Sequence, residues 1–177
     1  MIAKHHEPRF AALLHANRGI VFKVAGLYSR NSADRDDLMQ EISAQLWRAF
    51  GSYSETKGKF STWMYRIALN VAISQARRQP WSEADRLEPL QRHHLETVAG
   101  AEPSDEPDER LVALYAFIGR LDALNRALIL LYLEDHSYAE IAAILGISET
   151  NVATKISRIK STLRGQMVTP PTDKARV

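Results

Sequence analysis

Two stretches of helical periodicity, separated by a stretch that has none, constrain the fold of this chain most. Apolar residues recur every three or four positions over residues 9–80 and again over 110–165, as on one face of an α-helix. Residues 81–109 lack this spacing and contain three prolines, nine acidic residues and only two arginines, a net charge of −7. Such a segment cannot bury much apolar surface and is predicted to be a flexible acidic linker. We therefore predict an all-α chain with two small helical domains, at 1–80 and 110–165, and a tail at 166–177.

The first of these domains is expected to contain helices joined by short breaks. Asn17-Arg18-Gly19 interrupts the first periodic run and is expected to bend or break it. Asn31-Ser32 is a helix-start signal, and the acidic residues that follow favour the positive end of a helix. Gly51 to Lys59 has no apolar periodicity and is predicted to be a loop. The helices are predicted at about 9–28, 32–50 and 61–80.

The second domain ends in a pattern typical of a helix-turn-helix. Ser137 and Glu140 have the capping-box spacing, in which each side chain satisfies an exposed amide at the start of the helix. Ile141, Ala142 and Leu145 are expected to face inward. Gly146 suits the tight turn, and Ser148 can cap the following helix. In that helix the spacing predicts a buried stripe of Val152, Ile156, Ile159 and Leu163.

The opposite face of the last helix is polar and basic. The second helix of such a pair usually enters the major groove, where Asn and Arg can contact adenine and guanine and Lys suits phosphates. The same face is also typical of a solvated helix in a bundle. The candidate DNA-binding residues are Glu149, Thr150, Asn151, Thr154, Lys155, Arg158 and Lys160.

A second candidate surface follows the loop at 51–59. Lys57, Lys59 and Arg66 lie among aromatic residues that include Phe60 and Trp63. Aromatic rings can stack on unpaired bases while cations follow the phosphate backbone, and glycine at position 58 lets a backbone approach closely. The alternative, that Phe60 and Trp63 belong to the core, stays open at this point.

The composition excludes several kinds of chemistry. The chain has no cysteine, which excludes disulfides, thiolate metal sites and cysteine nucleophiles. His5-His6 and His93-His94 are the obvious ligand pairs, but adjacent residues on a helix point about 100° apart and cannot easily share a metal. No run approaches the roughly 20 apolar residues of a membrane span, and the first ten residues lack the apolar core of a signal peptide. We expect no metal, no cofactor, no enzymatic activity and a cytoplasmic protein.

Three segments together resemble bacterial RNA polymerase sigma factors of the extracytoplasmic-function group of the sigma-70 family. DRDDLMQEISAQLW (residues 34–47) is similar to the family's acidic helix, which docks on the clamp helices of the polymerase. GKFSTWMYRIALN (58–70) is similar to the segment that reads and helps open the minus-ten element. SYAEIAAILGISETNVATKISRIKSTLR (137–164) is similar to the region that reads the minus-thirty-five element. The chain departs from the residues often found in the family at four positions, Leu69, Ser74, Asn125 and Ala153. These departures affect which promoter sequence the chain is expected to prefer.

The resemblance implies a function and a set of sites. It implies that the chain binds core RNA polymerase and promoter DNA, that it helps open the DNA, and that a separate anti-sigma factor controls it. Without the family resemblance, the acidic face is more typical of a solvated helix, because acids in a first helical turn are favourable in any helix. The residues implied for polymerase binding are Asp34, Asp36, Asp37, Gln40 and Glu41. The residues implied for the minus-ten element are Lys57, Gly58, Lys59, Phe60, Ser61, Thr62, Trp63, Arg66 and Asn70.

Other functions remain alternatives at this stage. A stand-alone helix-turn-helix regulator would normally dimerise on a palindrome and bind its DNA without polymerase. A sigma mimic that sequesters an anti-sigma factor would need no basic recognition face. Dependence of specific DNA binding on core polymerase distinguishes the first alternative from a sigma factor.

Overall fold

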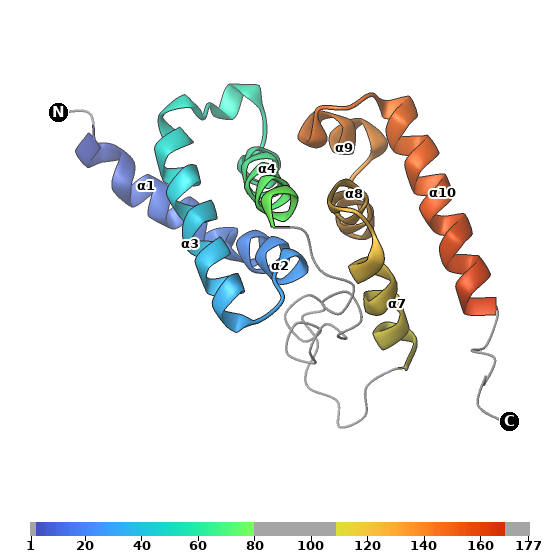
Figure 1. Cartoon of the computed structure of the whole chain (residues 1–177). Helices are drawn as coiled ribbons and strands as arrows, with labels where there is room; N and C mark the ends of the chain where they lie inside the picture. The colour runs from blue at the N-terminus through green and yellow to red at the C-terminus, as the bar shows by residue number, and fades with distance from the viewer. Residues whose placement is uncertain (1–2, 80–108, 169–177) are drawn as a thin grey trace, which may run out of the picture.

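The computed structural model describes residues 3–79 and 109–168, and every regular element in these ranges is a helix (Figure 1). The predicted linker and the predicted tail beyond Val168 lie outside the described residues, as does the His93-His94 pair. The N-terminal block, residues 3–79, contains α1 (Ala3–Ala16), α2 (Arg18–Tyr28), α3 (Ser32–Ala49), the 3-10 turns η1 (Phe50–Ser52) and η2 (Glu55–Lys57), and α4 (Phe60–Arg78). The C-terminal block, residues 109–168, contains α7 (Glu109–Arg120), α8 (Ala123–Leu133), α9 (Tyr138–Leu145) and α10 (Glu149–Val168).

The predicted break in the first helical run is confirmed at Asn17. α1 ends at Ala16 and α2 begins at Arg18, and the side-chain amide of Asn17 donates a hydrogen bond to the carbonyl oxygen of Leu13, 2.8 Å away. Asparagine often competes in this way with the helical backbone for hydrogen bonds. Two helices therefore replace one long helix, and α1 extends away from the rest of the N-terminal block (Figure 1).

The start of α3 is also as predicted. The Asn31 side chain accepts a hydrogen bond from the backbone N–H of Asp34 at 2.8 Å, which satisfies one of the free amides at the helix start. α2, α3 and α4 pack against one another around side chains that are almost entirely buried. The largest of them are Val24, Leu38, Ile42, Leu46, Met64 and Leu69.

The helix-turn-helix has the predicted caps. Ser137 and Glu140 form the reciprocal capping box at the start of α9, and Gly146 ends α9 with a left-handed φ of 69°. Ser148 Oγ accepts a hydrogen bond from the backbone N–H of Asn151 at 3.2 Å, which caps α10. α10 continues to Val168, past the predicted start of the tail at residue 166.

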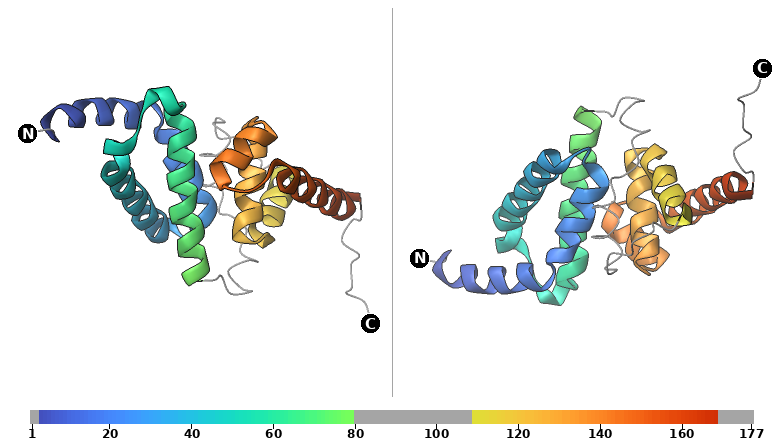
Figure 2. Two further views of the ribbon diagram at one scale, coloured as in Figure 1. Left: turned by 90° about the horizontal axis from the view of Figure 1, so that it is seen from above. Right: turned by 90° about the horizontal axis from the view of Figure 1, so that it is seen from below.

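The two blocks pack directly against each other. α4 lies between α2 and α3 on one side and α8 and α9 on the other (Figures 1 and 2). The Tyr28 hydroxyl donates a hydrogen bond to the backbone oxygen of Ala123, and Lys23 forms an ion pair with Glu134 across the same junction. α10 lies on the far side of the C-terminal block from α4 (Figure 2).

Candidate nucleic-acid interfaces and acidic surface

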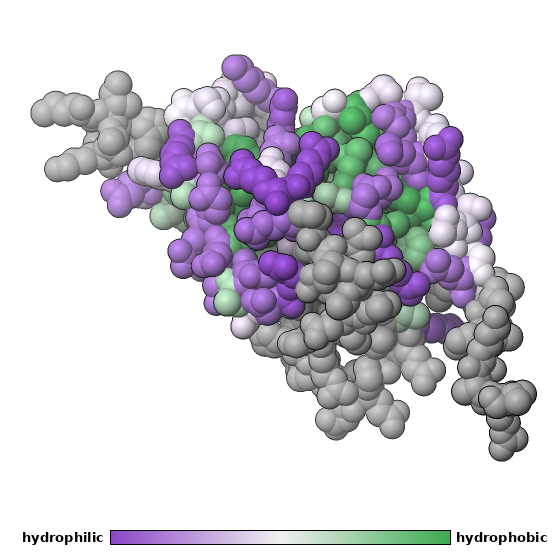
Figure 3. Space-filling view, viewed as in Figure 1, coloured by the Kyte–Doolittle hydropathy of each residue, from purple (hydrophilic) through white to green (hydrophobic). Residues whose placement is uncertain are grey.

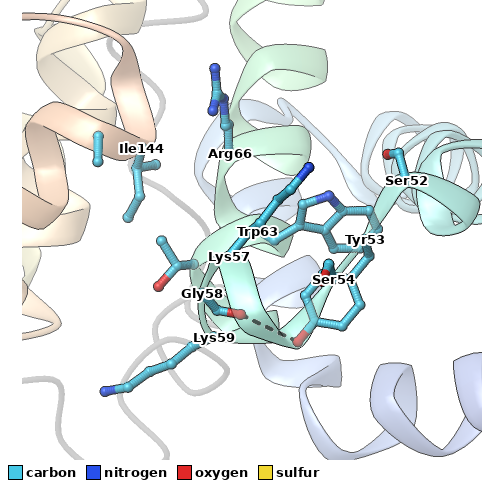
Figure 4. Close-up of a pocket in the computed structure, with 11 residues that line it drawn as sticks. Ser52, Tyr53, Ser54, Lys57, Gly58, Lys59, Trp63, Arg66 and Ile144 are labelled. Carbon is cyan, nitrogen blue, oxygen red and sulfur yellow. Dashed lines mark hydrogen bonds between the residues drawn. The ribbon is translucent and has the colours of Figure 1, made fainter.

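A hollow of about 260 Å³ lies beside the loop between α3 and α4 (Figure 4). The η1–η2 loop and the first turns of α4 form most of its wall, and α9 of the C-terminal block forms the rest. The predicted loop at 51–59 is thus partly ordered into two single 3-10 turns. The lining residues are Ser52, Tyr53, Ser54, Lys57, Gly58, Lys59, Thr62, Trp63, Arg66, Ala143 and Ile144.

An aromatic cluster supports this hollow. The ring centroids of Tyr53 and Trp63 are 5.2 Å apart, and both rings lie within 5.3 Å of the ring of Phe60. Phe60 is 6% exposed and does not line the hollow, whereas Trp63 is only partly buried and does. The sequence left open whether Phe60 and Trp63 belong to the core or are available to stack on a base. In the structure Phe60 belongs to the core, and the ring of Trp63 is partly exposed at the surface.

Backbone geometry shapes the loop at Gly58. Its φ is 149°, a region that side-chain-bearing residues rarely adopt. The Tyr53 hydroxyl donates a hydrogen bond of 3.4 Å to the Gly58 carbonyl oxygen, which ties the loop back to the aromatic cluster (Figure 4). Glycine is needed here for conformation, since a Cβ at this position would meet no atom within 4 Å.

Cations surround the hollow. Lys57, Lys59 and Arg66 are exposed, and all three contribute to its lining. Glu55, on the same loop, pairs with Arg9 at 2.6 Å, and Glu140 of α9 lies close enough to Lys59 for the two charges to attract each other. A concave surface that combines an aromatic ring with cations suits an unstacked base and the backbone next to it.

Three of the predicted minus-ten residues lie elsewhere. Phe60 is in the core, and Ser61 is partly buried outside the hollow. Asn70 is exposed and lines a different hollow, of about 510 Å³, between α3 and α4. Ala143 and Ile144 line the first hollow and were missed by the sequence analysis, because no local pattern indicates that α9 packs beside this loop.

The face of α10 predicted to read DNA points to solvent. Glu149, Thr150, Asn151, Thr154 and Arg158 are exposed, while Val152, Ile156 and Ile159 are buried against α8 and α9. Lys155 is half-buried. Lys160 is also half-buried: its Nζ donates to the Tyr132 hydroxyl at 3.2 Å and lies 5.2 Å from the centre of that ring. The hydrogen bond and the cation–π contact with Tyr132 therefore restrict the conformation of the Lys160 side chain.

Two shallow hollows lie on α3, and each is lined by one of its acidic residues. Asp36 and Gln40 line one of about 530 Å³, and Glu41 lines the hollow that contains Asn70. Asp37 is exposed, and Asp34 forms an ion pair with Arg30 at 3.0 Å. Figure 3 shows hydrophilic side chains over much of the face formed by α3 and α4, with hydrophobic side chains visible between α9 and α10. The described part of α3 thus presents a largely polar surface, in which the exposed Trp47 is an apolar exception.

Metal and membrane sites are absent from the described residues. In the ranges 3–79 and 109–168 no group of three or more His, Asp or Glu residues is placed to hold a metal ion. In the same ranges no helix is long and apolar enough to cross a membrane. The side chains of His5 and His6 lie outside the described part of the structure.

Comparison with known families gives two matches. Residues 13–82 match the model described as sigma-70 region 2, and residues 111–163 match sigma-70 region 4. The chain is 31% identical to the ECF RNA polymerase sigma-E factor of Escherichia coli K12, over 80% of this chain and 78% of that protein. It is 33% identical to the ECF sigma factor SigE of Mycolicibacterium smegmatis, over 85% of this chain and 57% of that protein.

Two solved structures with a similar fold each contain the matching chain in a complex with another protein. CnrH bound to the cytosolic domain of CnrY has a TM-score of 0.63 and 23% identity, covering 91% of this chain and 88% of that one. RpoE from Bartonella quintana, bound to the anti-sigma factor NepR, has a TM-score of 0.64 and 19% identity, covering 97% of this chain and all of that one. These similarities support the all-α, two-block architecture.

Proposed function

The chain belongs to the extracytoplasmic-function group of the sigma-70 family and acts in promoter recognition and transcription initiation; from this premise we propose how its surfaces divide that role. Residues 1–80 form the domain that binds core RNA polymerase and the minus-ten element. Residues 110–165 form the domain that binds the minus-thirty-five element. Residues 81–109 connect the two, and residues 166–177 form a tail.

The hollow beside η1 and η2 holds an unpaired base of the minus-ten element. Trp63 offers a partly buried ring for stacking, and Lys57, Lys59 and Arg66 lie around it for the phosphates. This juxtaposition of ring and cations in one concavity is the observation that carries the proposal. Thr62 and the Gly58 backbone complete the wall of the hollow. Phe60 and Ser61 do not line the hollow and support the η1–η2 loop instead.

The exposed face of α10 reads the minus-thirty-five element in the major groove. Asn151 and Arg158 are long enough to contact base edges, and both are exposed. Lys155 and Lys160 contact phosphates, which position the helix without reading sequence. Glu149, Thr150 and Thr154 complete the face.

Core polymerase binds the polar surface of α3. Asp36, Asp37, Gln40 and Glu41 are exposed there, and Asp34 lies at its start. Asn70 shares a hollow with Glu41, so it lies at the border between the polymerase surface and the minus-ten surface. Acids in the first turn of a helix are favourable in any case, so Asp34 also stabilises α3 itself.

Control by a separate anti-sigma factor is the final part of the proposal. The structural relative from Bartonella quintana is bound to an anti-sigma factor, and this chain has a fold similar to it over nearly its whole length. The protein works in the cytoplasm by binding alone and performs no covalent chemistry of its own.

Transcription in vitro, with core polymerase and a randomised promoter library, tests the proposal. The expected result is enrichment of two sequence elements separated by a fixed spacing. Trp63→Ala should weaken the downstream preference and Arg158→Ala the upstream one, while Arg120→Ala, an exposed cation on α7, serves as a matched control that changes neither. Specific DNA binding by the chain alone, with no stimulation of transcription, would instead support a stand-alone regulator.

A further inference from the structure

The loop beside the hollow at Trp63 is shaped internally by short-range hydrogen bonds. The backbone N–H of Tyr53 donates to the backbone oxygen of Phe50 at 3.0 Å, which closes η1. The backbone N–H of Lys57 donates to the backbone oxygen of Ser54, also at 3.0 Å, which closes η2. Bonds between residues three apart set the shape of each turn, but they do not fix the loop against the rest of the domain.

An ion pair from α1 reaches this loop from far away in the sequence. Arg9 Nη2 donates a hydrogen bond to Glu55 Oε1 at 2.6 Å, across a separation of 46 positions. The side chains of Arg9 and Glu55 are 52% and 66% exposed, so water surrounds the pair and it stabilises the loop only weakly. The pair aligns η2 with α1, but a stronger contact is needed to hold the loop there.

Phe10 of α1 supplies the stronger contact. Its side chain is 8% exposed, and its ring centroid lies 5.1 Å from the ring centroids of both Trp47 and Phe50. The planes cross at 63° and 64°, an edge-to-face geometry that is favoured because the positive edge of one ring meets the negative face of another. Phe50 is the first residue of η1, so Phe10 holds the loop where it begins.

The ring contacts continue from Phe50 to the hollow. Phe50 stacks on Tyr53, with centroids 6.1 Å apart and planes 22° apart, and its centroid lies 6.4 Å from that of Trp63. Tyr53 and Trp63 both line the hollow (Figure 4). Phe10 is therefore separated from each of these two rings by one ring, that of Phe50, and a displacement of Phe50 would move both.

α1 itself stays outside the hollow. It passes beside the segment that joins α3 to α4 (Figure 2), and neither Phe10, Arg9 nor Glu55 contributes to the lining. A base in the hollow would therefore not touch these side chains. Any influence of α1 on such a base has to pass through the position of the loop.

We propose that α1 positions the minus-ten site: Phe10, assisted by Arg9, fixes the η1–η2 loop so that Tyr53 and Trp63 keep the geometry in which a base can stack. The inference rests on the proposed minus-ten role of this hollow. It makes Phe10 a positioning residue for promoter recognition that contacts no DNA, and it gives a role to a helix that otherwise projects from the domain.

Amide hydrogen exchange on the free full-length chain tests the positioning without DNA. Phe10→Ala should speed exchange of the Tyr53 and Lys57 amides roughly three- to tenfold, the range expected for the loss of one aromatic pair. Leu14→Ala is the matched control, because Leu14 is a partly buried apolar residue of α1 that packs against the same core. It should leave both amides unchanged. Circular dichroism establishes that each variant is folded.

A charge swap tests the part assigned to Arg9. Arg9→Glu places two carboxylates side by side and should speed exchange of the Lys57 amide about twofold, a small effect because the pair is exposed. Arg9→Glu combined with Glu55→Arg should return the exchange rate to that of the parent chain. A swap that restores nothing would overturn the role of Arg9.

Fluorescence of open complexes tests the consequence for the base. Holoenzyme is bound to promoters that carry 2-aminopurine at one position of the unpaired minus-ten strand at a time. Trp63→Ala should raise the fluorescence at the position that stacks in the hollow. Phe10→Ala should raise it at the same position and lower the preference for that base roughly three- to tenfold. Upstream preference and affinity for core polymerase should stay at the parent values, as they should in Leu14→Ala.

The outcomes separate the positioning role from the proposed function. Exchange and fluorescence at the parent values in a folded Phe10→Ala variant would overturn the inference. Equal changes in Phe10→Ala and Leu14→Ala would reveal general destabilisation and would overturn it too. Faster exchange with an unchanged base signal, where Trp63→Ala does change it, would overturn the link from the loop to the base. Faster exchange in Phe10→Ala with no effect of Trp63→Ala at any position would support the anchoring of the loop and count against the proposed function of the hollow.

Discussion

At the scale of single residues, we propose that the face of α10 separates side chains that read bases from those that position the helix. Asn151 and Arg158 are exposed, whereas Lys160 is held against Tyr132. We predict that Arg158→Ala or Asn151→Ala costs about 1–3 kcal/mol and relaxes preference at one upstream base pair. Lys160→Ala should weaken all sequences alike and lower the salt slope by about one unit. Binding of holoenzyme to promoter variants at several salt concentrations measures both effects, and unchanged preference and slope in all three variants would show that α10 does not read DNA.

The acidic surface of α3 gives a second prediction at this scale. Asp37 and Glu41 are exposed and lie away from the buried Leu38, Ile42 and Leu46. The double reversal Asp37→Lys and Glu41→Lys should therefore weaken binding to core polymerase while leaving helical content unchanged. Titration of labelled chain with core measures the affinity, and circular dichroism measures the helical content. As a control, the charge reversal Glu7→Lys on α1 should leave the affinity for core polymerase unchanged. If the double variant binds core polymerase as tightly as the parent chain, Asp37 and Glu41 only keep the surface solvated.

At the scale of elements, the caps and breaks were predictable because their causes are local. Asn17, Asn31, Ser137 and Gly146 each act on a backbone group within a few residues, and the structure confirms all four. The extent of burial along α4 was not predicted. Met64 and Ala68 are buried at helical spacing, and Tyr65, Leu69 and Ile73, on another side of the helix, are buried as well. Periodicity indicates one apolar face of a helix and does not reveal a second partner from a distant part of the chain.

The same limit applies to α9 and the candidate site. Ile141 is buried as expected, whereas Ala142 and Leu145 are only partly buried and Ile144, which was not expected, is 2% exposed. The loop cations and Trp63 could be predicted from residue types alone, since rings and cations in one short segment suit DNA. The contribution of Ala143 and Ile144 could not, because it depends on how two blocks far apart in sequence pack.

The α9 capping box makes the stability of this helix depend on pH. The backbone N–H of Ser137 and then its hydroxyl donate hydrogen bonds to the Glu140 carboxylate, which lowers its pKa below the ordinary value of 4.5. A lowered folded-state pKa contributes stability that is present above the unfolded pKa and is lost as pH falls through the folded pKa. We predict that Glu140→Gln lowers the melting temperature at pH 7 and that the difference from the parent shrinks below about pH 4. Thermal melts across pH 3–8 measure this, and a difference that does not vary with pH would contradict it.

At the scale of the whole molecule, each block depends on the other to cover part of its apolar surface. Residues 1–80 expressed alone would lack α8 and α9, which pack against α4, and would leave Tyr65 without its contacts to Glu134 and His136. Because burial of one such side chain contributes roughly 1.5–3 kcal/mol, the fragment should melt earlier than the full chain and bind a hydrophobic dye. Addition of residues 109–177 in trans should reduce dye binding.

Tyr65→Asp separates the two contributions to this result. In the fragment the substitution places a charge on the face of α4 that is no longer covered, so it should lower dye binding with little loss of stability. In the full chain the same carboxylate lies beside Glu134, whose carboxylate is 3.5 Å from the Tyr65 hydroxyl, and it should lower the melting temperature because the two like charges repel. A fragment that melts with the full chain and binds no dye, or a Tyr65→Asp effect that is the same in both contexts, would show that the two blocks are independent units that only touch.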